Sequence, residues 1–98
     1  MTTKPMAVIN EQSFRLGQVC ATPGVIEEIS VIDQMTALQR HARGDWGEVD
    51  PEDWAENELS LKEGFRLFSV CRSAHGVKFW VITEADRSVT TILLPSEY

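Results

Sequence analysis

The sequence has little of what metal-binding, disulfide-bonded and membrane proteins contain. Its 98 residues include two cysteines and two histidines. Cys20 and Cys71 lie far apart with no CxxC spacing, which argues against a disulfide framework and fits a reducing compartment. No apolar run approaches the roughly 20 residues that cross a bilayer, and residues 1–12 have no long apolar segment of the signal-peptide kind. We therefore expect a cytoplasmic protein with no membrane partner.

Basic residues are also scarce. The chain has 9 Lys and Arg against 15 Asp and Glu, a net charge of -6 and an isoelectric point near 4.8. Nucleic-acid binding depends largely on neutralising phosphates, so this balance argues against direct nucleic-acid binding. The 43% of hydrophobic and 24% of charged residues are ordinary for a globular chain, and the length allows one domain with a modest core.

Motifs of known catalytic chemistry are missing as well. The sequence contains no HExxH, GxGxxG, GxxxxGK[ST] or GxSxG pattern, so we expect no metal, no cofactor and no catalytic residue. His41 lies near the end of a predicted helix and His75 in a predicted turn, which favours capping and turn roles. Both cysteines fall in predicted strands, where a small buried hydrophobe is expected.

The first part of the chain predicts a strand and two helices. We expect residues 1–12 to be a flexible N-terminal segment and 13–98 to form a single α+β domain. Strand formers occupy 14–21, and a helical tract follows. In that tract Ser30 and Asp33 form a capping-box pattern that divides it into helices at 25–29 and 31–43. Its apolar residues recur at every third position, namely Ile26, Ile29, Ile32, Met35 and Leu38.

The next helix has clear boundaries. Asp50 can cap it, a proline follows at the first helical position, and Gly64 stops it, so the prediction is a helix over 51–63. We expect Trp54, Leu59 and Leu61 to face inward.

The remaining third predicts an antiparallel three-stranded meander with strands at 65–72, 77–83 and 88–94. The whole order is β-α-α-β-β-β, with the helices packed on one face of the sheet. If the last strand lies at the edge of the sheet, its unpaired backbone groups would allow a homodimer. A self-associating structural protein is therefore one alternative for the function.

Negative charge is concentrated in one segment. Residues 45–63 hold eight acids against one base, Lys62. This segment is either a solvated helix face or a surface for a basic protein partner, which clustered charge attracts.

Trp46 and Trp54 lie within this acidic segment and are either core anchors or interface residues. The turn at Asp86 and Arg87 is either a local structural turn or a contact loop beside the acidic helix. Our candidate binding residues are Asp45, Trp46, Glu48, Asp50, Glu52, Asp53, Glu56, Asp86 and Arg87.

One enzymatic alternative rests on topology. The predicted order resembles that of small toxin ribonucleases of the RelE/ParE kind, and it brings Arg66, Arg72, Arg87 and Tyr98 onto or beside one sheet. Such enzymes stabilise the phosphate with positive charge, which the acidic composition disfavours.

The segments RHARGDWGEVDPEDWAENELSLKEGFRLFSVCRS and KFWVITEADRSVTTILLPSEY resemble a group of short plasmid- and phage-borne bacterial proteins. The likeness covers 14–98, and its most specific parts are 41–47 and 82–98. Members carry the labels of a plasmid-related protein or of the M subunit of a type I restriction enzyme. No glycine-rich cofactor loop is present and the chain is too short for a methyltransferase, so the second label does not describe its chemistry.

The resemblance implies an accessory protein of a mobile genetic element. By analogy with other small acidic proteins in that setting, we expect a non-enzymatic inhibitor of a host nucleic-acid-handling defence complex, of the anti-restriction or anti-CRISPR type. Its acidic segment would contact a basic surface of that complex.

Overall fold

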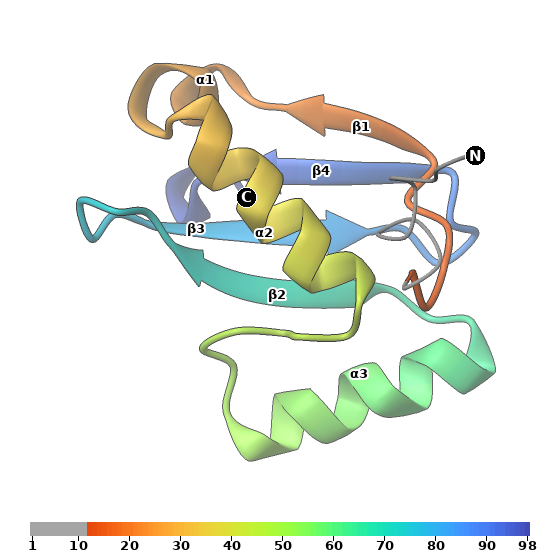
Figure 1. The fold of residues 1–98 in the computed structure, drawn as a ribbon. Helices are drawn as coiled ribbons and strands as arrows, with labels where there is room; N and C mark the ends of the chain where they lie inside the picture. Colours follow the sequence, from red (N-terminus) through yellow and green to blue (C-terminus); the bar gives the residue numbers. More distant parts are fainter. Residues whose placement is uncertain (1–11) are drawn as a thin grey trace, which may run out of the picture.

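The computed structural model describes residues 12–98, and the order of its elements roughly matches the predicted β-α-α-β-β-β, with a third α-helix and a short C-terminal 3-10 helix in addition (Figure 1). The fold is α+β, with a strand, three helices and a three-stranded meander. The expected flexible segment 1–12 lies, except for its last residue, outside the described residues. The elements are β1 (Gln18–Ala21), α1 (Pro23–Glu28), α2 (Val31–Ala42), α3 (Pro51–Glu63), β2 (Leu67–Arg72), β3 (Lys78–Thr83), β4 (Val89–Leu93) and the 3-10 helix η2 (Pro95–Glu97).

The four strands form one mixed sheet in the order β1-β4-β3-β2. The meander of β2, β3 and β4 is antiparallel, as predicted. β1 adds a parallel strand, with Gln18 opposite Val89. β4 therefore has a neighbour on each side, so it is not an edge strand, and the two edges of the sheet are β1 and β2.

Helix boundaries follow the capping residues. The Ser30 hydroxyl accepts a hydrogen bond from the Asp33 N–H (3.1 Å), and the Asp50 carboxylate accepts one from the Asp53 N–H (2.8 Å). Each bond satisfies an amide that has no partner within its helix. Gly64 ends α3 with a φ of 81°, which costs a glycine little. The predicted break at Ser30 and the predicted span of α3 are both confirmed.

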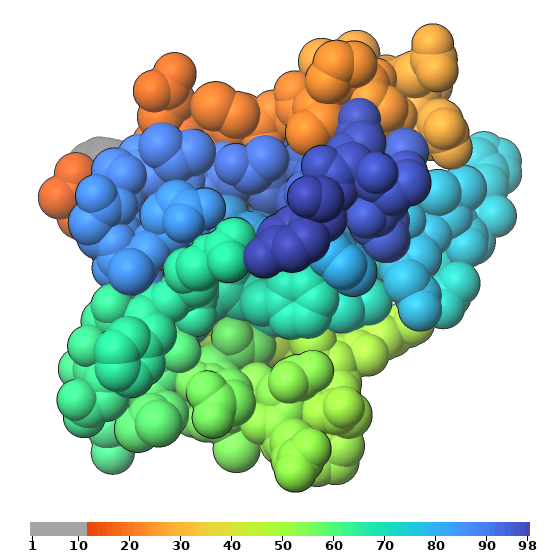
Figure 2. Space-filling view, turned by 180° about the vertical axis from the view of Figure 1, so that it is seen from behind, coloured from red at the N-terminus to blue at the C-terminus, as the bar shows by residue number. Residues whose placement is uncertain are grey.

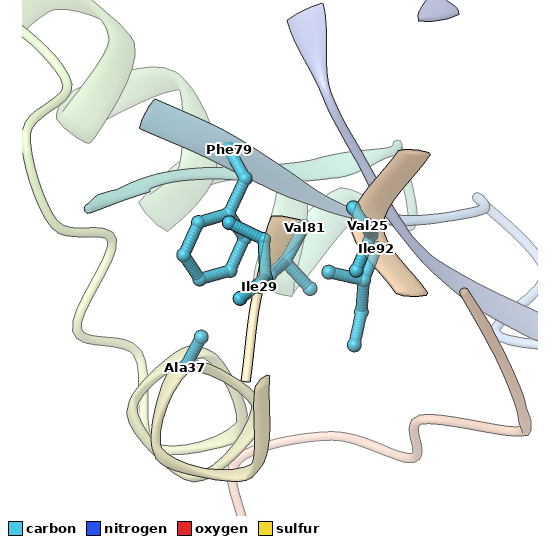
Figure 3. Packing of buried hydrophobic residues seen from close by; sticks show 6 residues of the cluster. All are labelled: Val25, Ile29, Ala37, Phe79, Val81 and Ile92. Carbon is cyan, nitrogen blue, oxygen red and sulfur yellow. The ribbon is translucent and has the colours of Figure 1, made fainter. Parts of the chain in front are cut away.

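The hydrophobic core lies between the first two helices and one face of the sheet, as Figure 3 shows. Every residue of its central cluster is at most 4% exposed. Burying side chains of this size supplies the main stabilisation of a small domain. The cluster comprises Val25, Ile29, Ala37, Phe79, Val81 and Ile92.

The apolar residues at every third position do not form one buried stripe. Ile29 is buried, whereas Ile26, Ile32 and Met35 are 67%, 77% and 54% exposed. The helical tract is interrupted at Ser30, so α1 and α2 are separate helices with different axes. Residues at every third position of the sequence therefore do not share one helix face.

The two cysteines differ in their surroundings. Cys20 is exposed on β1, so our expectation of two buried thiols is wrong for it. Cys71 is half-buried, and burial raises the pKa of its thiol to about 11. The Cys71 thiol is therefore protonated, and unreactive, at neutral pH.

α3 lies alongside β2 and has an inverted distribution of polarity (Figure 1). It buries Asn57 (3% exposed) and Ser60 (4%), while Trp54 and Leu59 are 37% and 46% exposed. The expectation that Trp54 and Leu59 face inward is therefore wrong, and Leu61 is half-buried. The reason is that α3 meets the hydrogen-bonding edge of a strand, where polar side chains are needed, instead of an apolar sheet face.

Asn57 pairs with the outer edge of β2 much as a neighbouring strand would. Its Oδ1 accepts a hydrogen bond from the Phe68 N–H (3.0 Å) and its Nδ2 donates one to the Phe68 carbonyl (2.7 Å). Two residues further on, Val70 donates to the Trp46 carbonyl and accepts from the Glu48 N–H. These four bonds satisfy the outward backbone groups of Phe68 and Val70 and close this part of the β2 edge to strand addition.

We expect the Asn57→Ala substitution to lower the free energy of unfolding by about 1–3 kcal/mol, because it leaves the N–H and carbonyl of Phe68 without partners. Urea denaturation followed by circular dichroism measures the loss, and hydrogen exchange at the Phe68 amide should accelerate. The control is Glu56→Ala, the preceding, exposed position of α3, which should change stability little. Equal losses in the two variants would show that the Asn57 bonds do not secure the edge.

Candidate binding surface

Trp46 is in the interior and not on the surface. Its side chain is 0% exposed and packs against the rings of His41 and Phe14, with centroids 5.5 Å and 6.2 Å away. Its indole N–H donates to the Glu58 carboxylate (2.9 Å). The predicted contact residue is therefore the core anchor that we gave as its alternative role, and it attaches the acidic loop to the domain.

Gly47 makes this position of Trp46 attainable. Its φ is 75°, and it forms a bridge with Val70 on β2. A Cβ atom at this position would overlap the carbonyl oxygen of Val70. Only glycine allows the loop to come this close to the strand.

His41 is fully buried at the centre of a polar chain that runs across the sheet. Its Nδ1 lies 2.6 Å from the Ser69 hydroxyl and its Nε2 lies 2.9 Å from the Thr83 hydroxyl. Thr83 in turn bonds to Thr90 (2.7 Å), and Thr90 donates to the carbonyl of Leu16 (2.6 Å). His41 is thus part of the core, and the predicted capping role is wrong.

The carbonyl at the end of this chain fixes every proton in it. Because Thr90 donates its only hydroxyl proton to Leu16, it must accept from Thr83, and Thr83 must then accept from His41. Nε2 of His41 therefore carries the proton and Nδ1 accepts from Ser69. Burial, helped by the positive charge of Arg87, lowers the pKa of His41 from 6.5 to about 3, so the ring is neutral.

Two predicted binding acids are paired with arginines of the same chain. Asp45 accepts from the Arg40 Nε–H at 2.8 Å, and Glu48 accepts from Arg72 Nη2 at 2.9 Å. The hydrogen bond from Arg40 lowers the pKa of Asp45, and that from Arg72 lowers the pKa of Glu48. Part of the negative charge of the segment is therefore balanced within the molecule.

Two other predicted acids bind backbone amides. Asp50 caps α3 through the Asp53 N–H. Asp86 accepts from the Ser88 N–H (3.0 Å) and also bonds to the Ser88 hydroxyl, which lowers the pKa of Asp86. Both contacts are local, so the structural alternative accounts for Asp50 and Asp86.

Arg87 connects the turn between β3 and β4 to α3. It has a positive φ of 61°. Its guanidinium donates to the carbonyls of Phe65 (2.7 Å), Glu84 (3.1 Å) and Ser60 (3.0 Å). These bonds hold the C-terminal end of α3 against the sheet and occupy the donors that a contact loop would need.

Glu52, Asp53 and Glu56 are the predicted residues whose side chains stay unpaired within residues 12–98. All three are exposed on α3, and within residues 12–98 no hydrogen bond or ion pair engages their side chains. Helical spacing places Glu52, Glu56 and Glu63 in one row that also contains Leu59. We call these three glutamates the acidic row. Figure 2 shows α3, in green, at one end of the molecule, and all three glutamates of the row are exposed.

The residues of the ribonuclease alternative do not converge. Arg72 is paired with Glu48, and Arg87 is bound to carbonyl groups. Arg66 and Arg72 lie at opposite ends of β2, roughly 20 Å apart along the strand. Arg66 and Tyr98 remain together, with Nη1 donating to the tyrosine hydroxyl at 3.0 Å.

An aromatic groove that was not predicted from the sequence lies on the sheet face opposite α1 and α2, which we call the open face. Phe68, Trp80, Ile82 and Tyr98 line it together with Arg66. The signal was present in the strands FRLFSVCR and KFWVIT, where large apolar residues occupy both faces instead of alternating with polar ones.

Within residues 12–98, no three His, Cys, Asp or Glu side chains are grouped so that they could hold a metal ion. The helices of this range are too short and too polar to cross a membrane. Comparison of the chain with protein-family models, curated proteins and solved structures gives no match.

Proposed function

We propose that the chain is a non-enzymatic binding protein that recognises a basic protein surface through α3. The observation that carries the proposal is the inverted polarity of this helix. It buries Asn57 and Ser60 and presents the acidic row with Leu59 to solvent. Exposed glutamates at a spacing of four repel one another and weaken a helix by a few tenths of a kcal/mol, so a cationic partner would relieve a cost that the free protein carries.

The partner that we propose is a nucleic-acid-handling complex of a bacterial host, met in the cytoplasm by a protein of a mobile element. Proteins that hold nucleic acids carry basic surfaces. An acidic helix can bind such a surface and compete with the phosphates for it. This choice of partner rests on the resemblance of the sequence to plasmid- and phage-borne proteins.

The test compares two pairs of charge removals. Glu52→Gln with Glu56→Gln removes two charges from the acidic row, and Glu27→Gln with Glu28→Gln removes two exposed charges from α1. Tagged proteins are used to capture partners from bacterial lysate, and the captured protein is then purified and titrated. We expect the double substitution in α3 to weaken binding of the captured protein about tenfold at low salt. The factor should become smaller as the salt concentration rises.

The α1 pair is expected to bind like the unchanged protein. If both pairs weaken binding equally, net charge alone drives the association and α3 is not the recognition surface. Unchanged binding in the α3 pair would also refute the proposal. Circular dichroism of both pairs verifies that the fold is retained.

A further inference from the structure

The open face of the sheet carries a preformed aromatic groove of about 290 Å³. None of α1, α2 and α3 covers it, and Figure 2 views the molecule from this side, with the C-terminal residues, including η2, in dark blue over part of the strands. Its walls come from β2, β3 and the residue after η2. The lining residues are Arg66, Leu67, Phe68, Trp80, Ile82 and Tyr98.

The aromatic rings of the groove hold one another in place. Trp80 packs edge-to-face against Phe68 and Tyr98, with centroid distances of 5.0 Å and 5.6 Å. Tyr98 is 70% exposed, yet the Arg66 guanidinium lies 5.7 Å from its ring centroid and donates to its hydroxyl. A ligand would therefore meet aromatic faces that are already ordered, which reduces the entropy lost on binding.

The polar groups of the groove are hydrogen-bond donors. Among the described residues no acceptor engages the indole N–H of Trp80. The Tyr98 hydroxyl accepts from Arg66, so its own proton is available to a ligand. A complementary ligand has apolar surface and acceptors but few donors. A run of prolines has this character, because proline has no N–H and its extended backbone exposes carbonyl groups.

Charge around the groove selects against anionic ligands. The Nε of Arg66 lies 3.4 Å from the Glu84 carboxylate, which offsets the one positive side chain. Arg66 and Phe68 also line an adjoining hollow whose far wall carries Asp53 and Glu56 of α3. A nucleic-acid strand would be repelled here, whereas a lysine or arginine next to the prolines would be attracted.

We propose that this groove binds an extended, proline-containing peptide segment that carries a basic residue at one end. The prolines lie against Trp80 and Tyr98, and the basic side chain reaches Asp53 and Glu56. The inference rests on the proposed function in that the segment belongs to the basic partner, and it names the part of the partner that is recognised.

The probe is a capped synthetic peptide of one lysine followed by about six prolines. In a ¹⁵N-labelled sample we expect it to shift the Trp80 indole signal, with saturation in the submillimolar to millimolar range. Tyr98→Ala, at an exposed position, should weaken binding about tenfold and leave the fold intact. Met35→Ala, exposed on the other side of the sheet, is the matched control and should not change the affinity.

Two further peptides test the chemistry. Serine in place of the lysine should weaken binding about threefold, and alanines in place of the prolines should abolish it. The inference is refuted if the proline peptide leaves the Trp80 signal unchanged up to several millimolar. It is also refuted if Tyr98→Ala binds normally, or if an oligouridylate shifts Trp80 and the peptide does not.

The two proposals can fail separately. If the α3 charge pair loses the captured partner while Tyr98→Ala keeps it, the groove does not hold the partner and only the proposed function stands. In the opposite case the peptide binds, Tyr98→Ala abolishes peptide binding, and the double substitution in α3 leaves binding of the captured partner unchanged. The groove is then a peptide site and the acidic row is not a recognition surface.

Discussion

Replacing Trp46 by alanine should lower the free energy of unfolding by about 3–5 kcal/mol. The side chain is fully buried between Phe14 and His41, and its N–H is bonded to Glu58. Its removal leaves a cavity and frees the loop that bonds to the outer edge of β2. A domain of this size has a total stability of roughly 5–15 kcal/mol, so part of the population should unfold near body temperature.

Urea denaturation followed by far-ultraviolet circular dichroism measures the effect, because the substitution also alters tryptophan fluorescence. Trp54→Ala is the matched control in the same acidic segment, with its side chain 37% exposed, and it should cost less than about 1 kcal/mol. If the two substitutions proved equally mild, Trp46 would not be the anchor of the loop, and the hypothesis that it contacts a partner would regain support.

The second large effect is a loss of stability in mild acid. The pKa of His41 is about 3 in the folded protein, against about 6.5 in an unfolded chain. Between these values only the unfolded state binds the proton, so unfolding becomes easier as the pH falls. His41 therefore contributes its full stabilisation above pH 6.5 and loses it by about pH 3, a total of about 5 kcal/mol.

The range from pH 6.5 to 5 isolates this effect, because carboxylates change protonation at lower pH. The free energy of unfolding should fall there by about 1.4 kcal/mol per pH unit. His41→Gln removes the titrating ring and should flatten the dependence, whereas His75→Gln, in an exposed turn, should preserve it. A flat profile in the unchanged protein would contradict the buried neutral imidazole. The ¹⁵N chemical shifts of the ring should independently show the proton on Nε2.

The sequence predicted those parts of the fold that depend on local chemistry. Ser30, Asp50 and Gly64 set helix boundaries through contacts with the nearest turn of backbone, so their spacing is sufficient information. The pairing of β1 with β4 depends on residues at distant positions, and no local signal distinguishes it from an antiparallel neighbour.

The candidate site was predicted less well, for a related reason. Charge counting identifies Asp45 and Glu48 as acids but cannot show that Arg40 and Arg72 lie within bonding distance of them. The burial of Asn57 was equally hidden, because an amide facing inward becomes favourable only where it meets a strand edge.

The position of β4 also bears on how the protein folds. β4 is the last strand along the chain, yet it lies between β1 and β3, and Gln18 of β1 pairs with Val89. The chain must therefore close a loop spanning most of its length before β1 gains any partner in the sheet. Such long-range closure slows folding, and a nascent chain that stops short of β4 would leave β1 unpaired and one edge of β3 open to aggregation.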